Sequence, residues 1–200
     1  MIADLFKFLT KKELEDRLRE MGLRFEQLAG GKLCLLDEEL NESGICFYFD
    51  MNGNIYKAVV ETDYIGDKNR FKEFLRAVRD KYGLKKDVSV EVKVKDFLWL
   101  DDLENRLVGK TVFRQLGREC VFDDELNAEV CFDLGRKYGR DVVRRVKVKT
   151  TFLGGKERFK QFLERLKRKY GLPRTIEVDV ITVPEEKLEE TRWWYERGHV

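Results

Sequence analysis

The chain has a single histidine, His199, and no glycine-rich phosphate-binding loop. One histidine is too few for most histidine-based acid–base chemistry, catalytic triads and histidine-rich metal sites. Gly154-Gly155 precedes a predicted helix but lacks the Gly-Lys-Thr/Ser ending of a phosphate loop, and Gly30-Gly31 is typical of a turn. The sequence therefore predicts no catalytic residue and no cofactor, and it favours a binding or assembly role over an enzyme.

Long apolar stretches and secretory features are also missing. No run of about 18 apolar residues could span a bilayer, and residues 1–10 lack the apolar core and cleavage site of a signal peptide. The formal net charge is only +2, which by itself predicts neither a nucleic-acid nor a membrane partner. We therefore expect a cytoplasmic protein with no membrane partner.

Proline, glutamine and methionine are scarce, whereas charged residues make up 39% of the chain. This charge-rich, amide-poor composition resembles that of heat-adapted proteins. Hydrophobic residues make up 42% and aromatic residues 12%, which is enough to build a packed core. A disordered chain is therefore excluded.

The sequence does contain an internal repeat. Apolar residues at the spacing i, i+3, i+4, i+7, i+11 begin at Phe71 and again at Phe159, 88 positions later, and each series ends before a glycine, Gly83 or Gly171. This spacing is typical of one face of an α-helix, and glycine commonly follows a helix. Alternating apolar residues at 88–94 and 176–182 then predict a strand after each helix.

Earlier segments of the two copies also match. The matched pairs are Cys34-Leu-Leu-Asp-Glu-Glu-Leu-Asn41 with Cys120-Val-Phe-Asp-Asp-Glu-Leu-Asn127, Ile45-Cys-Phe47 with Val130-Cys-Phe132, and Phe25-Glu-Gln-Leu28 with Phe113-Arg-Gln-Leu116. Thr10 with Glu13, and Asp101 with Glu104, predict a capped helix at the start of each copy. So many matches indicate a tandem duplication.

We therefore predict an α+β protein made of two copies of an α-β-β-β-α-β unit, residues 1–95 and 96–183, with an aromatic tail or short helix at 184–200. Each unit is expected to form an antiparallel sheet with its helices on one face. The connection at 94–100 is apolar and lacks Gly, Pro and Ser, unlike a flexible linker. A pseudo-two-fold arrangement of the copies follows as an expectation.

Five features occur together in the first copy: an amphipathic helix ending near glycine, an aromatic strand, the Asn-Gly hairpin in Asp50-Met-Asn-Gly53, a strand with a terminal acidic residue, and a helix ending in Lys-Tyr-Gly. Their combination resembles a conserved family of uncharacterised open reading frames from chloroplast and cyanobacterial genomes. The resemblance covers residues 10–83 and, less fully, 100–171, where Arg136-Lys-Tyr-Gly139 replaces the Asn-Gly turn. It implies no function and no site residues.

The four cysteines hold matching places in the two copies, Cys34 with Cys120 and Cys46 with Cys131. In each copy the two cysteines fall on neighbouring strands of a predicted hairpin, where facing side chains come within about 4.5–5.5 Å. Free half-buried thiols, the disulfides Cys34–Cys46 and Cys120–Cys131, and a four-thiolate metal site are the alternatives. No C-x-x-C spacing supports zinc, so no metal site is assigned.

Two acidic clusters, Asp37-Glu-Glu39 and Asp123-Asp-Glu125, fall where hairpin loops are expected. Carboxylates in such clusters could bind a cation. Loop carboxylates are usually solvated, and we expect these to face the solvent.

Basic residues are concentrated in the second copy, with 15 basic and 3 acidic residues at 136–174 against 9 and 6 at the aligned positions 48–86. We predict that part of this set binds a polyanion such as nucleic acid, because Lys and Arg contact phosphates whatever the base sequence. The predicted residues are Arg144, Arg145, Lys147 and Lys149 on a strand, and Lys156, Lys160, Lys167, Arg168 and Lys169 on the following helix. The opposite face of that strand is expected to carry Val146, Val148, Thr150 and Phe152.

Internal ion pairing is the competing interpretation of this basic region. Glu177 and Asp179 fall on the matching face of the next predicted strand and could neutralise part of the basic row. Residues 101–133 carry nine acidic and four basic residues that could also fold onto it or onto a neighbouring subunit.

The tail carries three consecutive aromatic residues, Trp193, Trp194 and Tyr195, after a predicted helix start at Thr182-Val-Pro-Glu185. Such residues dock either on the protein's own core or on a partner. The alternative function is therefore a structural protein that assembles, as a homodimer for example, through this tail.

Overall fold

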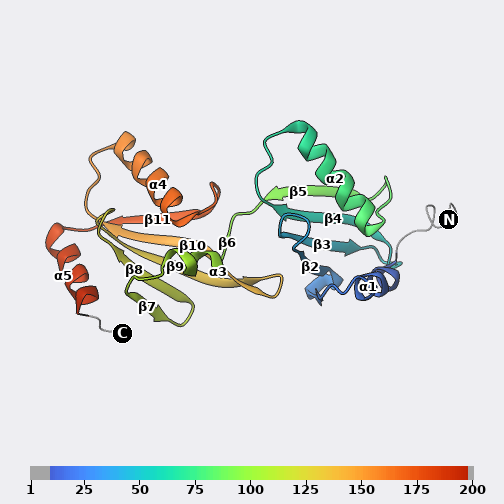
Figure 1. The fold of residues 1–200 in the computed structure, drawn as a ribbon, viewed down its shortest axis with the longest axis horizontal. Helices are drawn as coiled ribbons and strands as arrows, with labels where there is room; N and C mark the ends of the chain where they lie inside the picture. Colours follow the sequence, from blue (N-terminus) through green and yellow to red (C-terminus); the bar gives the residue numbers. More distant parts are fainter. Residues whose placement is uncertain (1–9, 198–200) are drawn as a thin grey trace. The chain divides into compact units, whose positions relative to one another are not determined.

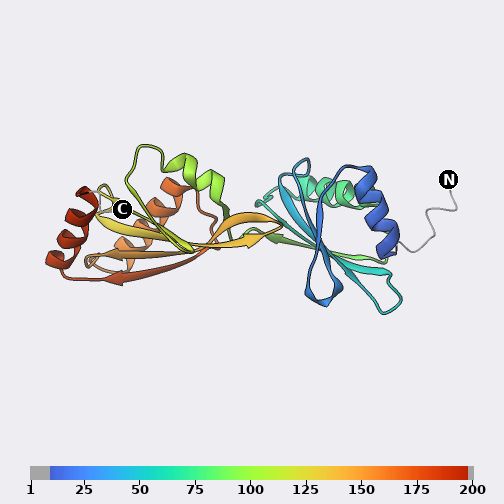
Figure 2. The same ribbon diagram turned by 90° about the horizontal axis from the view of Figure 1, so that it is seen from below.

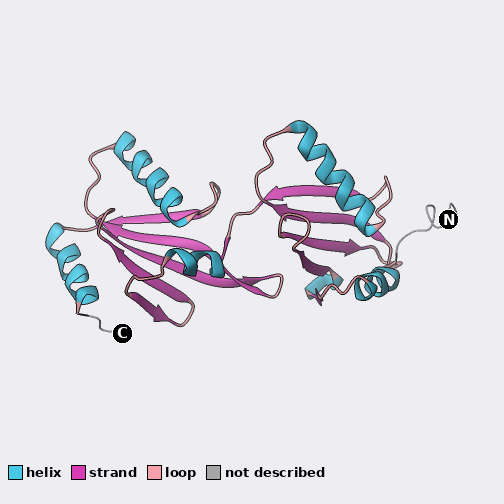
Figure 3. Cartoon of the chain, in the orientation of Figure 1, coloured by secondary structure: helices cyan, strands magenta, loops and turns pink. Residues whose placement is uncertain are grey.

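The computed structural model describes residues 10–197, and the chain divides into two compact units, Met1–Lys95 and Asp96–Val200. Within residues 10–197 the chain forms five α-helices and eleven strands, and both units combine one sheet with packed helices (Figures 1 and 3). The protein is therefore α+β.

The first unit has five strands in sequence order, β1-β2-β3-β4-β5. Neighbouring strands are antiparallel except β4 and β5, which are parallel because helix α2 carries the chain back across the sheet. The elements are α1 (Lys11–Glu20), β1 (Phe25–Gln27), the 3-10 helix η2 (Ala29–Gly31), β2 (Leu33–Asp37), β3 (Ser43–Phe49), β4 (Ile55–Thr62), α2 (Lys68–Tyr82) and β5 (Ser89–Val94).

The second unit has the strand order β11-β10-β9-β8-β7, and a short strand, β6, also pairs with β10. Strands β10 and β11 are parallel and are joined through helix α4. The elements are β6 (Leu98–Trp99), α3 (Leu100–Arg106), β7 (Val112–Gln115), β8 (Arg118–Asp123), β9 (Ala128–Lys137), β10 (Arg140–Thr150), α4 (Lys156–Tyr170), β11 (Glu177–Thr182) and α5 (Glu185–Glu196).

The sheets are thus mixed, and the prediction of antiparallel sheets was wrong for the last strand of each unit. Each unit also contains strands that the sequence did not predict. Strands β1, β6 and β7 have three, two and four residues, which is too short for an alternating pattern to stand out.

Each unit has its own hydrophobic core between one face of the sheet and two helices. In the first unit, Leu14 of α1 and Val78 of α2 are fully buried against Leu35, Phe47 and Val60 of the sheet. The second unit repeats this arrangement with Leu103 of α3, Leu166 of α4, and Val121, Val130 and Phe132 of the sheet. Figure 2 shows α3 and α4 on the same side of the second sheet. The other face of each sheet, called the open face below, lies opposite these helices.

The helix boundaries follow local capping. Thr10 and Glu13 form the predicted capping box of α1, and α2 and α4 end at Gly83 and Gly171, both with positive φ. Helix α3, however, begins at Leu100, so Asp101 lies in its first turn instead of capping it. In that position the carboxylate of Asp101 forms an ion pair with Arg140 at 3.3 Å.

One sequence match between the two units does not correspond to a structural match. Phe25 of β1 lies opposite Leu35 and faces the core, whereas Phe113 of β7 lies opposite Cys120 and faces the open side. The ring of Phe25 lies under the guanidinium of Arg19, 5.5 Å from its centre. Phe113 instead contacts α5, which covers part of the second unit only.

None of the helices within residues 10–197 is both long enough and apolar enough to cross a lipid bilayer.

Candidate polyanion-binding surface of the second unit

Strand β10 carries three of the predicted cations on the open face of the sheet. Arg145, Lys147 and Lys149 alternate with Val146 and Val148, which are buried under the helices. Successive side chains of a strand point to opposite faces, so the three cations form a row along one side of β10.

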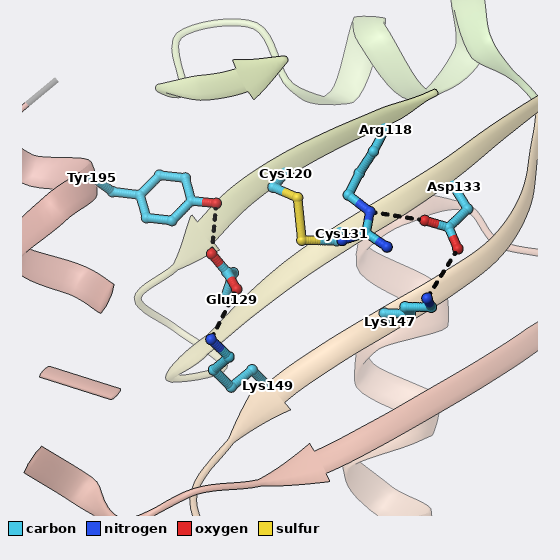
Figure 4. The surroundings of a disulfide bond; sticks show 8 residues. All are labelled: Arg118, Cys120, Glu129, Cys131, Asp133, Lys147, Lys149 and Tyr195. Atoms are coloured by element: carbon cyan, nitrogen blue, oxygen red, sulfur yellow. Dashed lines mark hydrogen bonds and ion pairs between the residues drawn. A yellow bond between two sulfur atoms is a disulfide. The ribbon is translucent and has the colours of Figure 1, made fainter. Parts of the chain in front are cut away.

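Carboxylates on the neighbouring strand β9 partly neutralise this row (Figure 4). Asp133 accepts hydrogen bonds from Arg118 at 3.0 Å and Arg145 at 3.1 Å, and it lies 3.8 Å from the ammonium of Lys147. Burial alone would raise the pKa of Asp133, but the hydrogen bonds from Arg145 and Arg118 lower it. The carboxylate is therefore ionised and balances part of the charge around it.

The rest of the β9–β10 hairpin shows the same pairing. Lys149 lies 3.7 Å from Glu129, Lys137 lies 3.5 Å from Asp96, and Arg140 pairs with Asp101 as described above. Arg144 differs: it is exposed and sits beside a register shift in β10, with its side chain over the backbone of Gly135. Most of the excess basic charge of this hairpin is thus compensated within the unit.

Helix α4 carries the other five predicted cations on the opposite face of the sheet, since its buried residues pack under Val146 and Val148. The nine predicted residues therefore do not form one continuous surface. Two of the five are engaged locally. Lys167 donates to the carbonyl oxygen of Arg174 at 2.8 Å, and Lys169 pairs with Asp123 at 2.9 Å and Glu125 at 3.0 Å.

Three predicted cations of α4 remain exposed, Lys156, Lys160 and Arg168, and Arg158 is a fourth that the sequence prediction did not include. Within the part of the chain that the structure describes, none of these four forms an ion pair with a carboxylate. All four are therefore available to an anionic ligand, and we call them the α4 cations. The signal for Arg158 was present in the sequence as the middle member of the series Lys156, Arg158, Lys160.

The acidic clusters that were expected in solvent begin with buried residues. Asp37 is 0% exposed and accepts hydrogen bonds from Tyr82 and from Lys81, the latter at 3.0 Å. Asp123 is 1% exposed and accepts from Tyr170 and from Lys169. The expectation of solvated carboxylates was therefore wrong for the first residue of each cluster.

These two carboxylates are structural anchors for the Lys-Tyr-Gly helix ends. Burial alone would raise the pKa of Asp123, but hydrogen bonds from Lys169, Tyr170 and the backbone N–H of Leu126 lower it. Burial and the adjacent carboxylate raise the pKa of Tyr170, which therefore stays a hydrogen-bond donor. Burial alone would lower the pKa of Lys169, but its hydrogen bonds to Asp123 and Glu125 raise the pKa overall.

The cysteines form two disulfides, Cys34–Cys46 and Cys120–Cys131, each joining facing residues of adjacent strands on the open face. Within residues 10–197 there is no free cysteine, and no group of three or more His, Cys, Asp or Glu side chains is arranged to hold a metal ion. His199 lies outside the described residues.

Helix α5 covers the second disulfide. Trp194 contacts the ring of Phe113 edge-on at 4.6 Å. The hydroxyl of Tyr195 donates to Glu129 at 2.8 Å, as Figure 4 shows. Trp193 is instead half exposed, with the guanidinium of Arg197 over its ring at 4.4 Å. Trp194 and Tyr195 therefore pack inside the unit.

No protein-family model matches the chain. No curated protein and no solved structure matches it significantly either.

Proposed function

We propose that the protein binds a polyanion, with nucleic acid as the leading ligand, and that the α4 cations make the contact. One observation carries this proposal: Lys156, Arg158, Lys160 and Arg168 are exposed on one helix without carboxylate partners. Unpaired surface cations attract phosphates at little desolvation cost, and each phosphate that they neutralise releases a counterion.

The row of cations on β10 is a less favourable binding surface than α4. Arg145, Lys147 and Lys149 already contact Asp133 or Glu129, so a phosphate would have to compete with a carboxylate for each of them. We therefore restrict the proposed contact to the helix side of the sheet.

The proposal is tested by titrating a labelled single-stranded oligonucleotide into the full chain and measuring fluorescence anisotropy at low and moderate salt. The variant Lys156→Ala/Lys160→Ala/Arg168→Ala should bind more weakly and should lower the slope of log affinity against log salt by about 0.7 for each lost contact on a single strand. The matched control, Arg145→Ala/Lys147→Ala/Lys149→Ala, removes as many cations from the opposite face and should change binding less. Absence of binding at low salt, or equal losses in both triple variants, would contradict the proposal.

We also propose that the two units arose by tandem duplication. The proposal is supported by their shared order of elements, the matching places of the two disulfides, and the recurrence of the Tyr–Asp–Lys contacts in both units. A pseudo-two-fold relation between the units, the family resemblance and a cytoplasmic location stay predictions.

A second function, self-assembly through the tail, is favoured by one observation. Trp193 is 50% exposed and lines a shallow depression with Glu185, Glu186, Glu189 and Glu190. Exposed tryptophan is enriched at protein interfaces. Sedimentation of the wild-type protein and of Trp193→Ala tests this function: a dimer that the substitution dissociates supports it, and a wild-type monomer contradicts it.

A further inference from the structure

Phe152 lies outside the strand to which the sequence assigned it. The sequence predicts it on the strand face that carries Val146 and Val148, but β10 ends at Thr150, and Phe152 lies in the loop before α4 with 81% of its surface exposed. Burying a large apolar side chain typically stabilises a protein by about 1.5–3 kcal/mol, and the exposed ring of Phe152 does not contribute this free energy. No ring contact or cation–π contact engages it within the described part of the chain.

Basic residues follow this exposed ring in the sequence. The side chain of Arg158 folds back over Gly154, with its Cδ and Nη1 only 3.0 and 3.1 Å from the place where a Cβ of Gly154 would lie. Gly154 is two residues from Phe152, so the side chain of Arg158 lies beside the short loop that carries the ring. The exposed Lys156 and Lys160 follow in the first two turns of α4.

The first unit provides an internal comparison. Tyr64 holds the corresponding place, two residues after the end of β4 and four before the start of α2, and it is 67% exposed. Its basic neighbours are balanced by acidic ones, however, with three of each at 63–73. Asp63 precedes it, the carboxylate of Asp67 caps α2, and Glu73 lines the same depression as the Tyr64 ring.

In the second unit these three acidic positions are occupied by uncharged residues, Thr151, Gly155 and Gln161. Residues 151–161 therefore carry three basic residues and one acidic residue, against three and three at 63–73. Position 155 has a backbone φ of +124°, which side-chain-bearing residues rarely adopt, so an aspartate like Asp67 does not fit there without a change of the loop. An exposed ring is kept in both units, but in the second unit it is combined with an excess of basic residues.

We propose that Phe152 is a base-stacking platform, so that the second unit prefers single-stranded nucleic acid over duplex and over polyanions that lack bases. This inference rests on the proposed function, because the α4 cations supply the phosphate contacts next to the ring. An exposed aromatic side chain stacks on an unpaired base of any sequence, whereas the bases of a duplex are already stacked on one another. Cations placed beside a stacking ring are the usual combination in proteins that bind single strands.

The experiment compares three probes on the full chain at one salt concentration: a labelled oligothymidylate, a duplex of the same length, and inorganic polyphosphate as a competitor. The variants are Phe152→Ala, Phe152→Tyr, which keeps a ring, and Tyr64→Ala as the matched control in the first unit. Because the side chain of Phe152 is exposed, none of these variants should unfold the protein.

Phe152→Ala should lower the affinity for the single strand about thirtyfold, the middle of the range for loss of one stacked base. It should leave the affinity for polyphosphate unchanged, Phe152→Tyr should bind like the wild type, and Tyr64→Ala should change little. Unchanged single-strand affinity in Phe152→Ala, or an equal loss for polyphosphate, would overturn the stacking inference. Either result would leave the proposed phosphate contacts of the α4 cations unaffected. Failure of the wild type to bind any of the three probes would overturn the proposed function together with it.

Discussion

Tyr170, the last residue of α4, donates its hydroxyl hydrogen to the buried carboxylate of Asp123, the last residue of β8. In the first unit Tyr82 and Asp37 make the same contact between the end of α2 and the end of β2. Each hydrogen bond connects the helix between the two parallel strands, α2 or α4, to a strand beyond the central strand of the sheet, β2 or β8. This explains the repeated Lys-Tyr-Gly sequence: the lysine and the tyrosine bind the aspartate, and the glycine ends the helix.

Removing this hydroxyl should destabilise the second unit. Tyr170→Phe keeps the ring in place but leaves Asp123 without one of its donors, and hydrogen bonds to charged groups contribute about 1.5–3 kcal/mol. We expect a loss of about 2 kcal/mol in the free energy of unfolding. All three tryptophans, Trp99, Trp193 and Trp194, lie in the second unit, so urea unfolding followed by tryptophan fluorescence reports on that unit alone.

Tyr56→Phe is the control for this substitution, because Tyr56 is 50% exposed and lies in the first unit. It should leave the tryptophan-detected transition where it is in the wild type. A loss below about 0.5 kcal/mol in Tyr170→Phe, the range of ordinary surface substitutions, would show that Asp123 does not depend on the tyrosine.

The same carboxylate should make the second unit sensitive to acid. The pKa of Asp123 is lower in the folded protein than in the unfolded chain, where it is about 3.9. Its ionised form therefore stabilises the fold above the unfolded pKa, and this contribution is lost as the pH falls through the folded pKa.

We expect the urea midpoint to fall between about pH 5 and pH 2 in the wild type, and to fall less steeply in Asp123→Asn. Some acid sensitivity should remain in the variant, because the pKa of Asp133 is also lowered. Parallel pH profiles for the two proteins would mean that Asp123 is not preferentially ionised in the folded state.

Patterns that depend on side-chain period could be predicted from the sequence. Phe74 and Phe162 recur at helical spacing, and both are buried in the cores as expected. The last strand of each unit and the capping box at Thr10 are likewise local features of the sequence. Such features were predictable because a residue's neighbours along the chain largely determine them.

Features that depend on register and on contacts between distant residues could not be predicted. Phe25 and Phe113 match in sequence, but a difference of one residue in strand pairing turns them to opposite faces. Phe152 continues the alternation of β10, yet the strand ends two residues earlier. The burial of Asp37 and Asp123 likewise depends on tyrosines that follow 45 and 47 residues later.

Neutralising Asp133 should release the strand cations. Asp133→Asn removes the carboxylate shared by Arg118, Arg145 and Lys147, so the open face should become able to hold phosphates. We expect the substitution, made in the Lys156→Ala/Lys160→Ala/Arg168→Ala background, to restore salt-sensitive oligonucleotide binding in anisotropy titrations.

Asp124→Asn is the control for this experiment, since Asp124 is exposed and pairs with Arg192 away from the strand row. This control should not restore oligonucleotide binding. If Asp133→Asn also restores no binding, ion pairing is not what keeps the strand row from a polyanion.

The disulfides should be present in the purified protein and should stabilise each unit separately. Without reduction the intact mass should be lower by four hydrogens, two for each bond. Each bond closes a loop of about a dozen residues, for which the chain-entropy estimate is about 3 kcal/mol.

Cys120→Ser/Cys131→Ser should therefore lower the stability detected by tryptophan fluorescence by about that amount. The corresponding Cys34→Ser/Cys46→Ser variant should leave this transition unchanged, because the tryptophans lie in the other unit. An unreduced mass that already equals the reduced mass would contradict the prediction at its first step.

Adjacent tryptophans of α5 should differ sharply in their contribution to stability. Trp194 packs on Phe113 and lies beside Tyr195 over the Cys120–Cys131 disulfide, whereas Trp193 is half exposed. Trp194 is partly buried, so Trp194→Ala should lower the free energy of unfolding by about 2 kcal/mol, less than the about 3–5 kcal/mol typical of a fully buried tryptophan. Trp193→Ala should cost about 0.5 kcal/mol or less. The unfolding can be followed by circular dichroism, which needs no tryptophan signal, and similar losses in the two variants would show that α5 does not dock through the face that contacts Phe113.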